Sequence, residues 1–255
     1  MVEKKNAGQK IAAPVRLEKD DKPDTSGIKR MQFGVEGLDE ALKGGIPEGD
    51  ITLLTGTSGT GKTTLAMQFL AYGARHGQKG IYFTLEESAN DIIQQFSVFD
   101  KGIVDLIATQ MLKIVEVPTV DYDSVKAILS SEIDAMEAKR VVIDSITYFQ
   151  MFFADVMSIR KAVIEVAAML KARGSVGIFV GEIPYGENKL SAFGVEEFAT
   201  DGVIALYLLE KQGTFTRALR IVKMRSTKHV MKYSPIDITE KGIVVYSNEK
   251  IAPDA

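Results

Sequence analysis

The sequence predicts an α/β fold in which a mostly parallel sheet is flanked by helices and extended at its C-terminal end by an antiparallel hairpin. Short continuous apolar runs alternate with amphipathic segments along most of the chain. Such runs are typical of strands buried on both faces, and the segments between them are typical of the helices that cover those faces. From about residue 202 the pattern changes to pairs of strand-like runs around short polar turns, which indicates antiparallel strands.

The apolar runs give the expected parallel strands. The run at residues 51–55 is short and apolar and ends in glycines, as a buried strand often does. Similar runs recur at intervals that leave room for a helix between them, so each pair of neighbouring runs can form a strand–helix–strand unit. We expect strands at residues 51–55, 80–85, 112–117, 140–144 and 176–180.

The segments between these runs have the spacing of helices. Leu65, Phe69 and Leu70 fall on one helical face, and Gly77 supplies a stop. Ser88 is a favourable N-cap for the next helix because its hydroxyl can accept a bond from a free backbone N–H. We expect helices at residues 62–76, from Ser88 through Phe96, at 123–138 and at 156–171.

The C-terminal part differs from the rest. Strand-like runs at residues 202–209 and 216–224 flank a polar turn, which predicts an antiparallel hairpin. Runs at 236–238 and 243–246 predict a second, smaller hairpin. No internal repeat or linker divides residues 31–247, so we predict one domain there, followed by a tail at residues 248–255.

The N-terminal segment and the composition limit the class of protein. Residues 1–30 are polar and lack a sustained period, which indicates a flexible arm or a solvated tail. The chain has 255 residues, 45% of them hydrophobic, and a net charge of -3, so no global positive field recruits nucleic acid or an anionic membrane. Cysteine is absent, which excludes disulfides and Cys-based zinc sites. The start lacks a secretory signal, and no apolar run approaches the length of a membrane span, so we expect a soluble cytoplasmic protein.

A glycine-rich loop follows the first strand and opens the first helix. Residues 56–63 read Gly-Thr-Ser-Gly-Thr-Gly-Lys-Thr and match the phosphate-loop pattern G-x-x-x-x-G-K-[ST] at every fixed position. The glycines let backbone N–H groups converge on phosphate oxygens, Lys62 adds a charge at the β- and γ-phosphates, and the Thr63 hydroxyl can ligate Mg²⁺. A glycine turn without a ligand is the alternative. The residues expected to hold the nucleotide are Thr57, Ser58, Gly59, Thr60, Gly61, Lys62, Thr63 and Thr64.

Two further acidic positions follow buried strands. Asp144 ends the run at residues 140–144 and is the expected second metal residue, which would hold Mg²⁺ together with Thr63, although an Asp at a strand end can simply cap a turn. Glu86 and Glu87 follow the strand at 80–85. Either they only complement the dipole of the next helix, or Glu86 is the general base for an attacking water and Glu87 is its partner.

At this point the chain resembles the KaiC-like proteins of the RecA/RadA superfamily. The similarity covers about residues 31–247 as a single KaiC-type domain. Four separated motifs carry it in the expected order: the lead-in at residues 33–49, the segment Phe-Thr-Leu-Glu-Glu-Ser at 83–88, Phe-Gly-Val-Glu-Glu-Phe at 193–198 and Lys-Met-Arg-Ser-Thr-Lys-His at 223–229.

The resemblance implies a RecA-type P-loop NTPase core that binds ATP and Mg²⁺ and forms a ring, commonly of six subunits, with ATP at each subunit interface. It makes Glu86 the expected general base. It also implies that Lys223 and Arg225 reach the γ-phosphate held by the neighbouring subunit, as an arginine finger does in trans. Side chains two residues apart on a strand leave it on one face, which fits this role, although two solvated cations on an exposed strand are the alternative. His229 is a candidate contact to ribose or base, or a structural residue of its turn.

The match also has departures. Clock-type KaiC has two tandem ATPase domains, whereas this chain has one. Glu197 and Phe198 stand where the autophosphorylating domain of that protein has a Ser-Thr pair, so self-kinase activity is not implied. Ser226 replaces a glycine that the family pattern has after Arg225.

Three functions compete on these observations. The first is a ring-forming, Mg²⁺-dependent ATPase with a regulatory or signalling role. The second is a RadA/RecA-like DNA-binding recombinase paralogue, but the two loops expected to face the polymer axis, 145–155 and 184–191, carry one lysine and two acids, a poor track for phosphates. Aromatic residues in the first of these loops could stack on bases, or could be buried against a helix or the next subunit. The third function is a signalling module that only binds ATP, which the complete set of Lys62, Glu86 and Asp144 disfavours.

Overall fold

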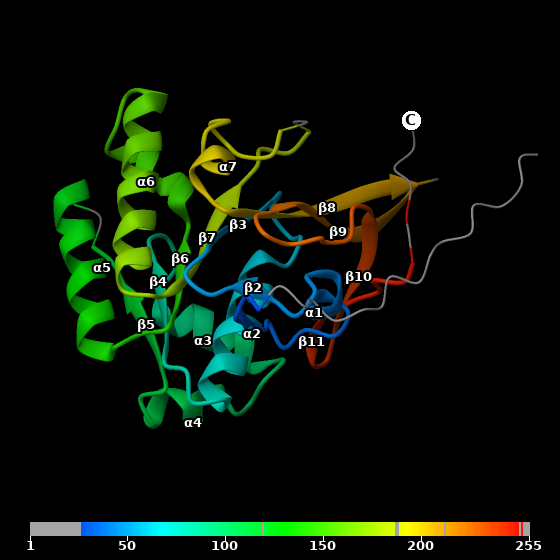
Figure 1. The fold of residues 1–255 in the computed structure, drawn as a ribbon, viewed down its shortest axis with the longest axis horizontal. Coiled ribbons are helices and arrows are strands. Elements are labelled where there is room, and N and C mark those ends of the chain that lie inside the picture. The colour runs from blue at the N-terminus through cyan, green and yellow to red at the C-terminus, as the bar shows by residue number, and fades with distance from the viewer. Residues whose placement is uncertain (1–26, 119, 187–188, 212, 250, 252–255) are drawn as a thin grey trace, which may run out of the picture.

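The fold is built on a nine-stranded sheet with helices on both faces (Figure 1). The computed structural model describes residues 27–118, 120–186, 189–211, 213–249 and 251. The sheet order is β11-β10-β9-β8-β3-β7-β6-β4-β5. Strands β3 to β8 run parallel to one another, and β9, β10 and β11 continue the sheet in antiparallel fashion. The predicted α/β class, with a mostly parallel sheet and C-terminal antiparallel strands, is confirmed.

The parallel strands are buried almost throughout, as their continuous apolar runs predict. Successive residues of a strand face opposite sides, so Leu54 and Val142 join the core on one side, while Leu53 and Val141 join the core on the other. The parallel strands are β3 (Ile51–Gly56), β4 (Gly80–Thr84), β5 (Leu112–Glu116), β6 (Arg140–Asp144), β7 (Val176–Glu182) and β8 (Gly202–Lys211).

Helices cover both faces of the sheet. One face carries α2 (Lys62–Arg75), α3 (Ala89–Ser97) and α4 (Ile103–Ala108), and the other carries α5 (Tyr122–Met136), α6 (Val156–Ala172) and the 3₁₀ helix η1 (Ile146–Met151). Three helices start in the same way, because the side chains of Ser88, Asp121 and Asp155 each accept a bond from the backbone N–H three residues on. The N-cap predicted at Ser88 is therefore confirmed.

The antiparallel strands lie beyond β8. They are β9 (Thr214–Met224), β10 (Tyr233–Thr239) and β11 (Gly242–Val245), and β9 pairs with β8 along nearly its whole length. A bulge interrupts this pairing, since Lys223 pairs with Val203 whereas Ile221 pairs with Ile204. Both predicted hairpins are present, and β8, β9 and β10 are longer than the sequence suggested.

The segment before β3 packs onto α2. A small second sheet joins β1 (Arg30–Met31) to β2 (Ile46–Pro47), and the short helix α1 (Leu38–Ala41) lies between these strands. The Asp39 carboxylate accepts bonds from the Phe33 and Gly34 N–H groups, at 2.7 Å and 2.9 Å, which fixes this turn. The predicted N-terminal arm falls mostly on residues 1–26, which lie outside the described residues, although Arg30 belongs to β1.

A buried arginine connects three parts of the fold. Arg140 of β6 is 1% exposed, and its Nη1 donates to the carbonyl oxygens of Gln32 and Phe69 at 2.6 Å and 2.8 Å. Its Nε donates to Gln78 Oε1 at 2.8 Å. Burial lowers the pKa of Arg140 to about 10, which leaves the group charged at neutral pH. Its guanidinium also fills the space beside Gly73, where a Cβ would lie 2.1 Å from Nε.

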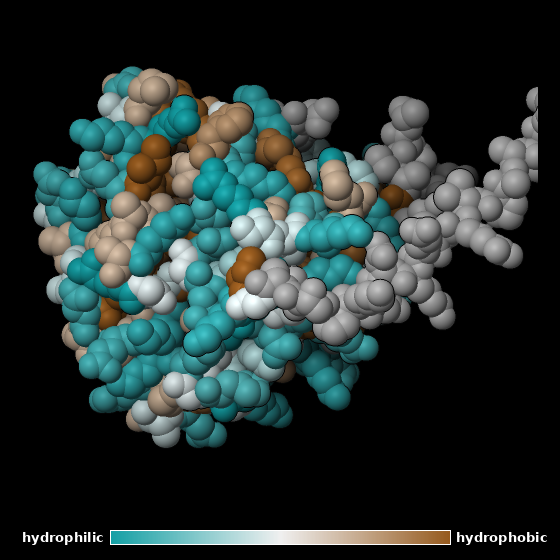
Figure 2. All heavy atoms as spheres, in the orientation of Figure 1, coloured by the Kyte–Doolittle hydropathy of each residue, from teal (hydrophilic) through white to brown (hydrophobic). Residues whose placement is uncertain are grey.

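The surface in view is hydrophilic over most of its area, with hydrophobic residues in small separated groups (Figure 2). No helix of the described residues is both long and apolar enough to cross a membrane. The sequence missed the short elements: the β1–β2 pair, α1, α4, η1 and α7 (Glu196–Ala199). These segments are too short to show a period, and contacts elsewhere in the chain determine them.

Candidate functional site

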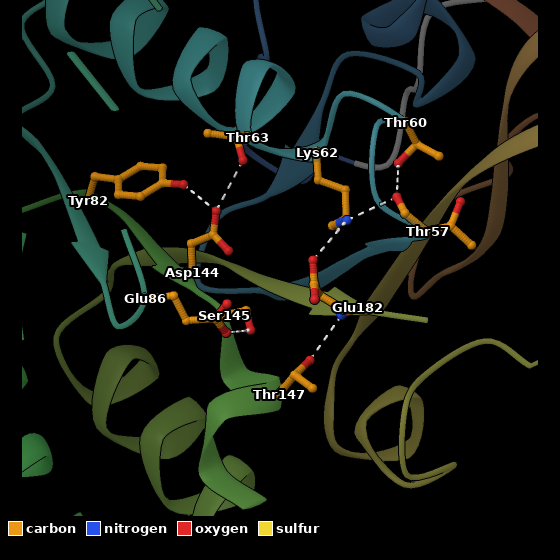
Figure 3. Close-up of polar contacts among 10 residues, drawn as sticks. All are labelled: Thr57, Thr60, Lys62, Thr63, Tyr82, Glu86, Asp144, Ser145, Thr147 and Glu182. Carbon is orange, nitrogen blue, oxygen red and sulfur yellow. Dashed lines mark hydrogen bonds and ion pairs between the residues drawn. The ribbon is translucent and has the colours of Figure 1, made fainter. Parts of the chain in front are cut away.

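The predicted phosphate loop lies at the carboxyl edge of the parallel sheet, between β3 and α2. Gly59 and Gly61 have φ values of +76° and +102°, a conformation that favours glycine. Inside the loop, Lys62 Nζ donates to the Thr57 carbonyl at 3.1 Å, and Thr60 Oγ1 donates to the same oxygen at 2.8 Å (Figure 3). No side chain caps the start of α2, so the first N–H groups of the helix remain available to an anion.

A cavity of about 270 Å³ opens beside this loop. Ligands of open parallel sheets bind in this region, outside the carboxyl ends of the strands. Of the predicted nucleotide residues of the loop, Thr57 and Thr60 are not among those that line the cavity. The Thr60 hydroxyl instead donates to the Thr57 carbonyl inside the loop. The lining consists of Ser58, Gly59, Gly61, Lys62, Thr63, Thr64, Thr84, Glu86, Glu87, Ile92, Gln95, Asp144 and Glu182.

Asp144 and Thr63, the two predicted metal residues, lie together in the lining of this cavity. Thr63 Oγ1 donates to Asp144 Oδ2 at 3.3 Å, and the buried Tyr82 hydroxyl donates to the same oxygen. Burial is the main cause that raises the pKa of Asp144 to about 6, and nearby Glu86 and Glu87 add to it. A divalent cation would favour the charged form, so the carboxylate and hydroxyl pair fits a hard cation such as Mg²⁺.

Glu86 and Glu87 both face the cavity but differ in their contacts. Glu86 Oε1 accepts a bond from Ser145 Oγ at 2.8 Å, which ties it to the residue after Asp144. Glu87 Oε2 instead accepts a bond from Gln95 Nε2 on α3 at 2.7 Å. Glu86 is therefore held toward the residue after Asp144, and Glu87 toward α3.

Glu182 is a cavity residue that the sequence did not suggest. It is the last residue of β7, and its Oε1 lies 3.6 Å from Lys62 Nζ (Figure 3). Its backbone N–H donates to Thr147 Oγ1 at 2.9 Å. The expected strand ended at Val180, two residues early, and an acidic residue at a parallel strand end was the signal that could have found Glu182.

Lys223 and Arg225 lie at the opposite edge of the sheet from the phosphate loop of the same subunit. Met224 pairs with Gly202, which pairs with Thr52 near the start of β3, about 13 Å along the strand from Gly56. Lys223 Nζ donates to the Glu197 carbonyl at 2.6 Å, and Arg225 Nη1 donates to Asp201 Oδ1 at 3.0 Å. The Arg225 side chain is 62% exposed at this edge.

His229 also lies away from the cavity. It belongs to the segment between β9 and β10, where the next residue, Val230, donates its N–H to the Ala41 carbonyl at 3.1 Å. Ser226, which replaces the expected glycine, keeps the left-handed conformation with a φ of +54°. The turn after Arg225 therefore keeps a conformation that glycine favours, at the steric cost of an ordinary side chain.

The phenylalanines after β6 pack against other side chains of the same chain. Phe149 is fully buried and lies with its ring centroid 5.7 Å from that of Tyr122 on α5. The Phe153 ring lies 5.1 Å from the same tyrosine, and Phe152 packs against the same core. Of the residues in this loop, Met151 is strongly exposed, at 68%. This arrangement leaves Phe149 unable to stack on a base.

Comparison with known proteins finds relatives of similar sequence and a solved structure of similar fold. A family model described as the KaiC ATPase matches residues 31–250. A UPF0273 protein of Pyrococcus furiosus is 34% identical over 87% of this chain and 96% of its own length. The circadian clock oscillator protein KaiC of a Picosynechococcus strain is also 34% identical, over 86% of this chain but 45% of its own length, so this chain spans about half of that protein. The crystal structure of a KaiC-like protein from Pyrococcus horikoshii matches with a TM-score of 0.79 and 38% identity, covering 86% of this chain and 99% of the other.

Proposed function

Since this chain belongs to the KaiC family of ATPases, we propose that it binds ATP with Mg²⁺ beside the phosphate loop and hydrolyses it to ADP and phosphate. The observation that carries the proposal is the convergence on one cavity of the phosphate loop, the Thr63–Asp144 pair and Glu86. These groups come from β3, α2, β6 and the end of β4, and they supply an anion cradle, a cation site and a base.

Each group has a task in the proposed hydrolysis. The N–H groups of the loop and the Lys62 ammonium hold the β- and γ-phosphates, and Thr63 and Asp144 would hold Mg²⁺. When bound, Mg²⁺ neutralises charge that develops on the phosphate oxygens. Glu86 orients a water and accepts its proton as the oxygen attacks the γ-phosphorus. The bond from that phosphorus to the bridging oxygen breaks, and its electron pair leaves with ADP.

We also propose that ATP is shared between subunits of a ring, commonly of six. Lys223 and Arg225 are too far from the phosphate loop of their own subunit to act there, since they lie at the other edge of the sheet. An interface that joins one edge of a subunit to the opposite edge of the next is heterologous, and such interfaces form a ring when the rotation between subunits closes and an open filament when it does not. Arg225 would then neutralise charge on the γ-phosphate of its neighbour.

We propose that the role of this ATPase is regulatory or signalling. We also propose that the protein acts in the cytoplasm. A recombinase filament is less well supported, because the loops after β6 and β7 provide few cations and Phe149 is buried.

The proposal predicts that Lys62→Ala abolishes tight ATP binding. Loss of a charge-assisted bond to phosphate lowers the affinity by at least about tenfold. Isothermal titration with MgATP measures the change, and Lys101→Ala, which removes an exposed lysine outside the cavity, is the control. Equal ATP affinities of the two variants, both with unchanged thermal unfolding, would contradict the assigned site.

A further inference from the structure

The phosphate-loop lysine already has an anionic partner within its own chain. Lys62 is 8% exposed, and Glu182 Oε1 lies 3.6 Å from its Nζ, at the place where the loop faces the cavity (Figure 3). The same Nζ is held from behind by the Thr57 carbonyl at 3.1 Å. The ammonium therefore has a backbone oxygen on one side and a carboxylate on the other, as it would with a bound phosphate in place of Glu182.

The position of Glu182 is fixed by the fold. The residue ends β7, which pairs with β3 so that Glu182 stands opposite Gly56, the first residue of the phosphate loop. Its N–H bonds to Thr147 Oγ1 on η1 at 2.9 Å, which holds the backbone while the side chain remains 50% exposed. A held backbone and an exposed side chain allow the carboxylate to leave Lys62 without a rearrangement of the core.

The carboxylates around the cavity oppose the binding of an anionic nucleotide, and one of them is paired with Lys62. Four carboxylates line it, those of Glu86, Glu87, Asp144 and Glu182, against the single lysine of the lining. Three of them accept hydrogen bonds from other side chains. Asp144 is bonded to Thr63 and Tyr82. Glu86 is bonded to Ser145, and Glu87 to Gln95. Glu182 alone among the four has an ion pair with Lys62, so it competes directly with the polyphosphate for the ammonium.

We propose that Glu182 is an internal competitor of phosphate that occupies Lys62 in the nucleotide-free protein and is displaced when a di- or triphosphate binds. This proposal rests on the proposed function, because it concerns the same nucleotide site. A competitor of this kind reduces the apparent affinity by the fraction of time that Lys62 is paired. It thereby sets the affinity for ADP and ATP without touching the reacting atoms.

The proposal predicts that Glu182→Gln binds nucleotide more tightly. The pair is partly exposed, so removing its charge should raise the affinity for ADP and for ATP by about three- to tenfold. Isothermal titration of the full chain with MgADP measures this without turnover. Glu87→Gln is the matched control, since it removes the same charge from the same cavity but from a carboxylate bonded to Gln95 instead of Lys62.

The comparison of the two variants distinguishes the direct contact of Glu182 with Lys62 from the general effect of one negative charge in the cavity. A gain for Glu182→Gln that clearly exceeds the gain for Glu87→Gln supports the proposal. An unchanged or weaker affinity of Glu182→Gln, or an equal gain in both variants, overturns it. If the unsubstituted protein binds no ADP or ATP, the proposed function itself fails, and this proposal fails with it.

Discussion

Glu86, Asp144 and Glu182 face one cavity, yet each has a different electrostatic environment. Asp144 is buried, its pKa is raised to about 6, and it is held by two hydroxyl groups. Glu86 accepts one bond from Ser145, and Glu182 lies beside Lys62. Because charge and burial separate the three, one can serve a cation, one a water and one the lysine.

Glu86→Gln tests the assignment of the base. An amide keeps the size of the side chain and can still accept the bond from Ser145, but it cannot take a proton from water. We expect ATP binding to persist and turnover to fall by about 10²-fold or more, measured as phosphate release under saturating MgATP.

The partner carboxylate gives the control for this prediction. Glu87 bonds to Gln95 and lies away from Ser145, so Glu87→Gln should lower turnover much less. Equal hydrolysis rates of the unsubstituted protein and Glu86→Gln would remove Glu86 from the role of base.

Among the elements, α2 has two separate structural tasks. Its first turn faces the cavity, and its last turn packs on β6 so closely that Gly73 leaves space for the buried Arg140. Helix propensity alone would favour alanine at position 73 by about 1 kcal/mol. The contact with Arg140 opposes that preference.

Gly73→Ala is therefore expected to destabilise the protein. The added Cβ would lie 2.1 Å from Arg140 Nε, and the guanidinium is held by bonds to Gln32 and Phe69, so we expect a loss of about 1–3 kcal/mol in the free energy of unfolding. Chemical denaturation measures it. Ala168→Gly on the exposed side of α6 is the control, because it measures the difference in helix propensity between alanine and glycine without a contact to Arg140. If Gly73→Ala instead stabilises the protein, Arg140 can move aside.

At the scale of the whole molecule, the sheet separates two groups of proposed catalytic residues. The cavity lies at the carboxyl edge of the parallel strands, and Lys223 and Arg225 lie at the amino edge. One subunit therefore has a complete phosphate loop at one edge and exposed cations at the other. In the proposed ring, a complete site would require two subunits.

Mixing of inactive variants tests this arrangement. Arg225→Ala and Glu86→Gln should each lose ATPase activity. In an equal mixture about one interface in four joins an intact Glu86 to an intact Arg225, so the mixture should have about a quarter of the activity of the unsubstituted protein. Phosphate release measures the regain. As a control, a mixture of Arg225→Ala with the double variant Glu86→Gln/Arg225→Ala should regain no activity. If the first mixture also regains no activity in assemblies proven to contain both variants, Arg225 does not act in trans.

Most of the local structure could be predicted from the sequence. Continuous apolar runs, helical spacing and a cap such as Ser88 are properties of neighbouring residues, so they gave the strands and helices that the structure confirms to within a few residues. The phosphate loop is local as well, because its glycines, Lys62 and Thr63 are consecutive along the chain. The membership of the KaiC family was recognisable for the same reason.

Contacts between distant segments could be decided only in three dimensions. The pairing of Glu182 with Lys62 depends on β7 lying beside β3, and the hydroxyl of Tyr82 reaches Asp144 because β4 lies beside β6. The position of Arg225 at the far edge likewise follows from the direction of β9. A sequence pattern reports what each segment buries, whereas the order and direction of strands in a sheet depend on which segments pair, and that is a property of the whole chain.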